Sequence, residues 1–68
     1  MCEVARFIHE KDALMSRVIK TESGFRVTLA DTDAGRELPT SFIFQDQERA
    51  TKRAEFLLFP EHFSYVQP

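Results

Sequence analysis

The most regular pattern of apolar positions lies near the C-terminal end of the chain. Asp46 is a favourable N-cap there, because its carboxylate can accept hydrogen bonds from the first free backbone N–H groups of a helix. The residue before a proline avoids the helical region, so the run ends before Pro60. Between them, apolar residues recur at the spacing of one helix face, at Ala50, Ala54, Leu57 and Leu58. The pattern predicts a helix over about 46–58.

Upstream of this helix, apolar and polar residues alternate with the period of two that is typical of strands. The alternation is clearest just after a short polar loop that ends in Gly24, which can supply the positive φ of a hairpin turn. A second turn cluster, rich in aspartate, ends in Gly35. These segments predict antiparallel strands over about 14–21, 25–30 and 37–44.

The N-terminal segment permits two interpretations. Its apolar residues fit a helical stripe over 4–18, but they also fit a strand over 4–9 that turns back into the strand over 14–21. Four consecutive polar residues interrupt the pattern at 9–12, which favours the strand. We therefore predict an α+β fold, a four-stranded antiparallel β-meander with one C-terminal helix packed on one face (β-β-β-β-α). The alternative is an N-terminal helix in place of the first strand (α-β-β-β-α), and in both cases a tail follows over 61–68.

A single helix can cover only one face of such a sheet. Alternation assigns the larger apolar side chains to the helix-facing side. This inner face comprises Ala5, Phe7, Val18, Phe25, Val27, Leu29, Leu38, Phe42 and Phe44. The opposite side, which we call the outer face, comprises Arg6, Ile8, Arg17, Ile19, Arg26, Thr28, Ser41 and Ile43. A shift of one residue in strand register would exchange the two faces.

The outer face has an unusual composition for a solvated sheet surface, which normally carries threonine, serine, lysine and glutamate. It combines three isoleucines with three arginines. Isolated exposed apolar residues are common and need no partner, whereas a contiguous patch marks an interaction surface. The candidate partner-binding residues are therefore Ile8, Ile19, Ile43, Arg6, Arg17 and Arg26.

Length and composition limit the class of protein. The chain has 68 residues, 43% of them hydrophobic and 29% charged, which predicts one small packed domain over 1–68. A domain of this size buries little of its surface and often needs a disulfide, a metal or a partner for stability. Its one cysteine, Cys2, cannot form an internal disulfide, and no signal peptide precedes the first strand, so we expect a cytoplasmic protein. The longest apolar run, 56–60, is much shorter than a membrane span.

Residues with catalytic or metal-binding chemistry are scattered. The segment from Asp31 to Gly35 begins like a calcium loop but lacks the later ligands, so it reads as a turn. His9, His62 and Cys2 lack the paired spacing of zinc ligands. The sequence shows no nucleophile elbow and no glycine-rich phosphate loop. We expect no enzymatic activity, no cofactor, no metal and no small-molecule substrate.

What remains is a function in binding. The first hypothesis is a protein–protein interaction or accessory domain that self-associates as a homodimer. The alternative is a nucleic-acid-associated protein whose outer-face arginines contact phosphates, although the net charge of −2 is not that of a dedicated nucleic-acid binder. The small size, the acidity and the β-β-β-β-α order are also similar to those of several small phage-encoded proteins, including some anti-CRISPR inhibitors. That similarity implies a phage or mobile-element inhibitor that binds a host protein, and it assigns no role to any residue.

Overall fold

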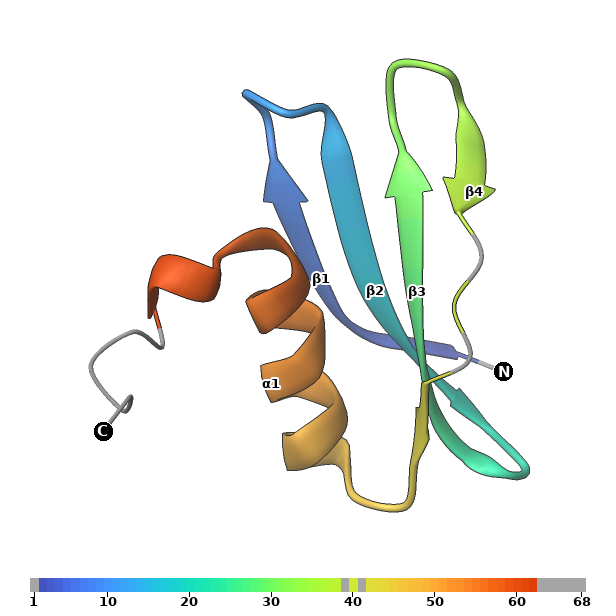
Figure 1. The fold of residues 1–68 in the computed structure, drawn as a ribbon. Coiled ribbons are helices and arrows are strands. Elements are labelled where there is room, and N and C mark those ends of the chain that lie inside the picture. Colours follow the sequence, from blue (N-terminus) through green and yellow to red (C-terminus); the bar gives the residue numbers. More distant parts are fainter. Residues whose placement is uncertain (1, 39, 41, 63–68) are drawn as a thin grey trace.

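The structure, a computed structural model, describes residues 2–38, 40 and 42–62. It is an antiparallel sheet with one helix packed across one face (Figure 1). The elements are β1 (Cys2–His9), β2 (Leu14–Thr21), β3 (Gly24–Asp31), β4 (Arg36–Leu38), β5 (Ile43–Phe44) and α1 (Gln47–Leu58). The predicted α+β meander with a C-terminal helix is confirmed. The alternative helix over 4–18 is wrong, because β1 and β2 pair as a hairpin through this segment.

Strand register confirms the predicted faces. Val18 on β2 pairs with Ala5 on β1 and with Val27 on β3, so all three lie on the same side of the sheet. Arg17 pairs in the same way with Arg6 and Thr28 on the other side. A bulge in β1 between Glu3 and Ala5 inserts one extra residue, Val4, which packs against the core.

The fourth strand departs from the prediction. Instead of one strand over 37–44, two short strands, β4 and β5, both pair with β3. Between them, the backbone groups of Val27 bond to the connecting segment. Its N–H donates to the carbonyl of Phe42 at 3.0 Å, and its carbonyl accepts from the Thr40 hydroxyl at 2.6 Å. Strand β4 ends at Leu38, and the next residue in the sequence is a proline, which has no N–H to donate to a ladder.

The helix begins and ends as its flanking residues predict. The Asp46 carboxylate accepts a hydrogen bond from the Arg49 N–H at 3.3 Å, which is an N-cap contact. At the other end, the Phe59 N–H donates to the Glu55 carbonyl at 2.8 Å, and a single 3₁₀ turn follows at 60–62. The rest of the predicted tail, 63–68, lies outside the described residues.

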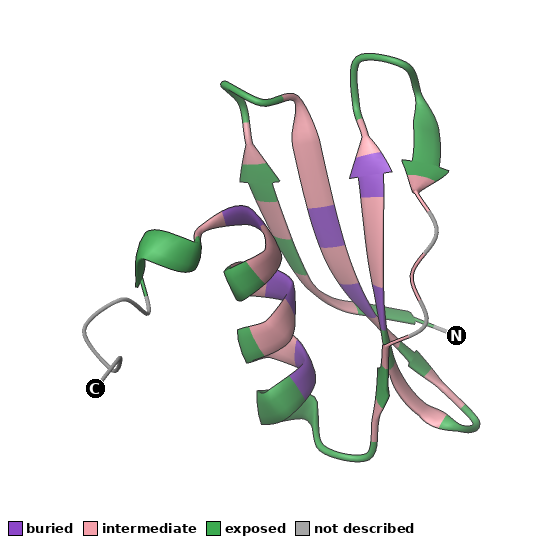
Figure 2. Cartoon of the chain, viewed as in Figure 1, coloured by how far each residue is buried: buried purple, intermediate pink, exposed green. Residues whose placement is uncertain are grey.

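The core lies between α1 and the middle of the sheet (Figure 2). Val18, Val27, Ala50 and Ala54 are each completely buried. Phe7, Phe25, Phe42, Phe44 and Leu57 surround this cluster as partly buried residues. The small alanines allow the helix backbone to approach the two valines closely.

One polar group is buried in the same layer. Ser16, on β2, has no solvent-exposed surface, and its hydroxyl donates to the Ala54 carbonyl of α1 at 2.7 Å. A buried hydroxyl without a partner would destabilise the fold, so this hydrogen bond fixes how the helix lies on the sheet. The alternation pattern treats Ser16 as an ordinary strand residue and gives no sign of this contact.

The two glycines offer a matched test of the hairpin geometry. Gly24 has a φ of +133°, and a Cβ there would collide with the backbone carbonyl oxygen of Phe44 on β5. Gly35 has a φ of +69°, and no atom lies within 4 Å of the place where its Cβ would be. Both positions disfavour a side chain by conformation, but only Gly24 also forbids one by contact.

We therefore predict that Gly24→Ala lowers the free energy of unfolding by about 2 kcal/mol or more. The control Gly35→Ala is expected to cost about 1 kcal/mol, since only the left-handed conformation is affected. Urea unfolding followed by circular dichroism measures both. Equal losses in the two variants would contradict the close approach of Phe44 to Gly24.

Candidate functional site

The outer face of the sheet is the first candidate site, because no helix or strand of residues 2–38, 40 and 42–62 covers it. Two of its predicted residues are half exposed, Ile8 at 50% and Ile43 at 52%. The other predicted residues that the structure describes range from partly buried to exposed. Ser41, the remaining member, lies outside the described residues.

Cross-strand pairing arranges the outer face in three rows. The first row runs across the sheet through Glu3, Ile19, Arg26 and Ile43. The second contains Arg6, Arg17 and Thr28, and the third contains Ile8 and Met15. The structure therefore brings Ile19 and Ile43 to either side of Arg26, but it does not bring Ile8 to them, because the arginine row lies between. The three isoleucines do not form one continuous apolar patch.

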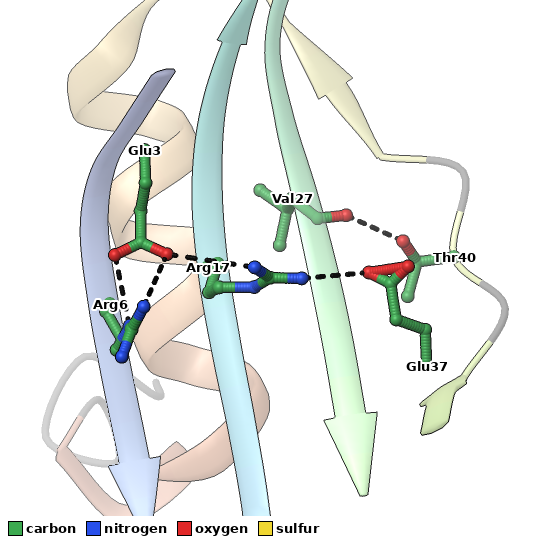
Figure 3. A network of polar contacts seen from close by, with 6 residues as sticks. All are labelled: Glu3, Arg6, Arg17, Val27, Glu37 and Thr40. Atoms are coloured by element: carbon green, nitrogen blue, oxygen red, sulfur yellow. Dashed lines mark hydrogen bonds and ion pairs between the residues drawn. The ribbon is translucent and has the colours of Figure 1, made fainter. Parts of the chain in front are cut away.

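Two of the three outer-face arginines are paired with carboxylates (Figure 3). Arg6 holds Glu3 through two contacts, of 3.0 and 3.1 Å. Arg17 reaches across β3 to the Glu37 carboxylate on β4 at 3.1 Å, and its other terminal nitrogen lies 3.9 Å from Glu3. The result is a chain of alternating charges that links β1, β2 and β4 over the sheet surface.

Arg26 is different from the other two. It is exposed, and within the described part of the chain its guanidinium forms no ion pair. Its neighbours in the row are the side chains of Ile19 and Ile43, one on each adjacent strand. An unpaired cation between two aliphatic side chains is a pattern typical of a binding surface, where arginine is enriched.

Next to this row lies an open groove of about 640 Å³. Its lining residues come from β2, β3, β4 and the segment that follows: Arg17, Ile19, Thr21, Arg26, Thr28, Glu37, Leu38 and Thr40. Leu38, which the sequence assigns to the inner face, pairs with Leu29 and also contributes to this groove at the sheet edge. Two enclosed polar atoms here, Arg17 Nε and Thr28 Oγ1, have no hydrogen-bond partner among the residues that the structure describes.

The groove offers donors, hydroxyls and aliphatic surface, which suit binding rather than metal chemistry. No three histidine, cysteine or acidic residues among those described come close enough together to hold a metal ion. Cys2 is a free, exposed thiol at the start of β1. The turn after Asp31 is held by its own carboxylate, whose Oδ1 accepts from the N–H groups of Asp33 and Ala34 at 2.9 and 3.1 Å.

The two histidines meet through an aromatic stack that the sequence does not reveal. The His9 ring and the His62 ring each lie 5.0 Å from the Phe59 ring, centroid to centroid, in stacked orientation. His62 Nδ1 also lies 2.8 Å from the Glu55 carboxylate. This cluster joins the end of β1 to the end of α1, so its role is to anchor the helix terminus.

A second groove lies where α1 meets β5, and sequence reasoning missed it. It is lined by Phe44, Arg49, Lys52, Arg53 and Phe56. The sequence suggests an evenly charged helix surface, because Glu48 and Glu55 alternate with the basic residues. In the structure Glu55 instead faces His62. The spacing of Arg49, Arg53 and Phe56 on one helix face was the available signal.

No family model, curated protein or solved structure matches the chain. Among the described residues, no helix combines the length and the apolar character that a membrane span requires.

The ion pairs on the outer face lead to a prediction about the stability of the fold. Glu37→Gln removes the carboxylate that Arg17 contacts at 3.1 Å, in a pair that is partly exposed. We expect a loss of about 0.5–1 kcal/mol in the free energy of unfolding at low salt, shrinking at high salt. The control Asp33→Asn removes an equal charge from an exposed turn position whose side chain holds no ion pair with a described residue. Urea unfolding at two salt concentrations tests the pair, and a loss that salt does not reduce would contradict it.

Proposed function

We propose that this chain is a small protein-interaction domain that self-associates through its outer face and acts by binding rather than by catalysis. The observation that carries the proposal is the row in which Arg26 lies between Ile19 and Ile43. Within residues 2–38, 40 and 42–62, Arg26 has no ion pair and no helix or strand covers this sheet surface. An antiparallel sheet can leave one face in water, but exposed isoleucines on that face favour a further layer that buries them. In this chain one layer is α1, and a second copy would supply the other.

Charge on the outer face supports a second copy as the occupant. The surface carries both signs, and the acids are accessible: the side chains of Glu3 and Glu37 are 32% and 59% exposed. Each carboxylate has more acceptor positions than the arginines beside it use. In a two-fold dimer, Arg26 of each copy can therefore find a carboxylate on the other.

The dimensions of the molecule also support this occupant. The chain measures 34 × 33 × 17 Å along its principal axes, so it is flat, with one dimension about half of the other two. A standard stable interface buries about 800 Å² on each partner. The broad face of such a molecule is wide enough for this, and two copies placed face to face would give a thickness typical of a small globular protein.

The alternative function, a phosphate-binding arginine stripe, has less support. Arg6 and Arg17 already contact Glu3 and Glu37, which cancels most of the charge that phosphates would meet. Of the three, Arg26 alone forms no ion pair with another described residue. A surface with one available cation does not make the multiple phosphate contacts that give nucleic-acid binding its affinity.

Sedimentation velocity over a range of protein concentrations tests the proposal. We expect the wild-type chain to form a dimer at high micromolar concentration, and Ile43→Glu to shift it to monomer, weakening association about tenfold or more, because a charge would be buried in the interface. Lys11→Gln changes the net charge by the same amount at an exposed turn and serves as the control. Circular dichroism checks that both variants fold.

Ile8→Glu tests how far the interface extends. Ile8 is as exposed as Ile43 but lies beyond the arginine row. We expect a smaller effect than at Ile43, since the proposed contact centres on Arg26. A wild-type chain that stays monomeric at high micromolar concentration, or an Ile43→Glu variant that dimerises normally, would overturn the proposal.

A further inference from the structure

The groove between α1 and β5 combines apolar rings with uncompensated positive charge. Five residues line it: Phe44 from β5, and Arg49, Lys52, Arg53 and Phe56 from α1. None of these lining residues is acidic. The volume is about 330 Å³, at the small end of the range for ligand sites. That volume suits one or two side chains rather than a large molecule.

The cations are available to a ligand. Arg49 and Arg53 form no ion pair with any carboxylate of the described residues. Lys52 lies 3.6 Å from Glu48, but both side chains are well exposed, at 66% and 75%. A pair that exposed contributes little and exchanges readily with another anion.

The rings and one of the cations hold each other in place. The Arg53 guanidinium lies 5.1 Å from the centre of the Phe42 ring and 5.6 Å from that of Phe56. These contacts are within the range of cation–π attraction, and they fix the guanidinium plane at the groove. Phe44 packs against the core cluster on its other side. The groove is therefore a formed surface, with an apolar floor and a cationic rim.

We propose that this groove binds an acidic segment of a partner protein that carries one large apolar side chain. The apolar side chain lies on the floor between Phe44 and Phe56, and flanking carboxylates accept hydrogen bonds from Arg49 and Arg53. Arginine suits this role because its planar fork matches a carboxylate. Complementary charge sets both the specificity and the orientation of the segment.

A peptide fits the groove better than a nucleic acid does. Single-strand binders stack bases on open aromatic faces, whereas the Arg53 guanidinium already occupies a face of the Phe42 and Phe56 rings. The small volume also accommodates one anchoring side chain rather than a succession of nucleotides. The preferred occupant is therefore a short acidic, apolar-anchored peptide.

This surface is separate from the one proposed for self-association. It involves α1 and β5, on the side of the sheet that the helix covers, whereas the dimer contact uses the outer face. The inference extends the proposed interaction function by naming the chemistry of a further partner. The two proposals depend on different residues, so an experiment can contradict one of them without contradicting the other.

Fluorescence anisotropy with a labelled peptide, Glu-Asp-Phe-Asp-Glu, tests the inference. We expect saturable binding at low salt that weakens about tenfold in Arg49→Glu, since an attraction becomes a repulsion, and further in the double variant with Lys52→Glu. Lys11→Glu makes the same change of charge in the β1–β2 turn, at the opposite end of the sheet from β5, and should bind like the wild type (Figure 1). Ile43→Glu should also retain peptide binding while losing self-association.

Three companion probes identify what the groove recognises. A peptide with lysine at the four acidic positions, one with serine in place of phenylalanine, and a short oligothymidylate are titrated under the same conditions. We expect the first not to bind and the second to bind at least fivefold more weakly. Absence of binding by the acidic peptide, equal binding by Arg49→Glu, or tighter binding of the oligothymidylate would each overturn the inference.

Discussion

Ala50 and Ala54 set the distance between α1 and the sheet, and the rest of the structure depends on that distance. With methyl groups at these two positions the helix lies directly on Val18 and Val27, and all four side chains are excluded from water. The hydrogen bond from the Ser16 hydroxyl to the Ala54 carbonyl is possible only at this close approach. A larger residue at Ala54 would separate the layers and take away the acceptor of the buried Ser16 hydroxyl. The phenylalanines pack around these four residues at the edge of the core and do not form its centre.

Among the described residues no apolar layer covers the second sheet face, and the outer face is organised by polar contacts instead. The carboxylates of Glu3 and Glu37 bind Arg6 and Arg17 along the surface, across strands that are already held by their backbone ladder. Surface ion pairs contribute little individually, so their main effect is to orient the side chains. Arg26 is left out of this arrangement. The helix is similar: Glu55 lies by His62, Lys52 has only the exposed Glu48 nearby, and Arg49 and Arg53 form no ion pair with a described residue.

Much of the fold follows from local patterns in the sequence. The bounds of β2 match the predicted 14–21, and α1 starts one residue after its predicted cap, because hydrophobic period and capping chemistry are both local. The break between β4 and β5 was not predictable in the same way. It depends on Thr40 and Phe42 meeting the backbone of Val27, which is distant in sequence. The burial of Ser16 was not predictable for the same reason, because its hydrogen-bond acceptor, the Ala54 carbonyl, is also distant in sequence.

The candidate sites show the same limit. Alternation alone assigned Ile8, Ile19, Ile43 and the three arginines to one face, and the strand register agrees. Which arginine lacks a partner depends on cross-strand neighbours and on side-chain reach, so it required the structure. The groove between α1 and β5 is lined by residues of a helix and of a strand that is only two residues long. Its lining residues come together only in the folded chain, so the groove also required the structure.

The divided fourth strand has a consequence for the edges of the sheet. An edge strand presents unpaired backbone groups, and a long, flat one invites another chain to add to it. On one side the sheet ends in strands of only three and two residues, and the connecting segment occupies both backbone groups of Val27. On the other side β1 is eight residues long, but a bulge near its start and the charged Glu3 and Arg6 interrupt it. Both borders are thus poor templates for the addition of a strand from another chain.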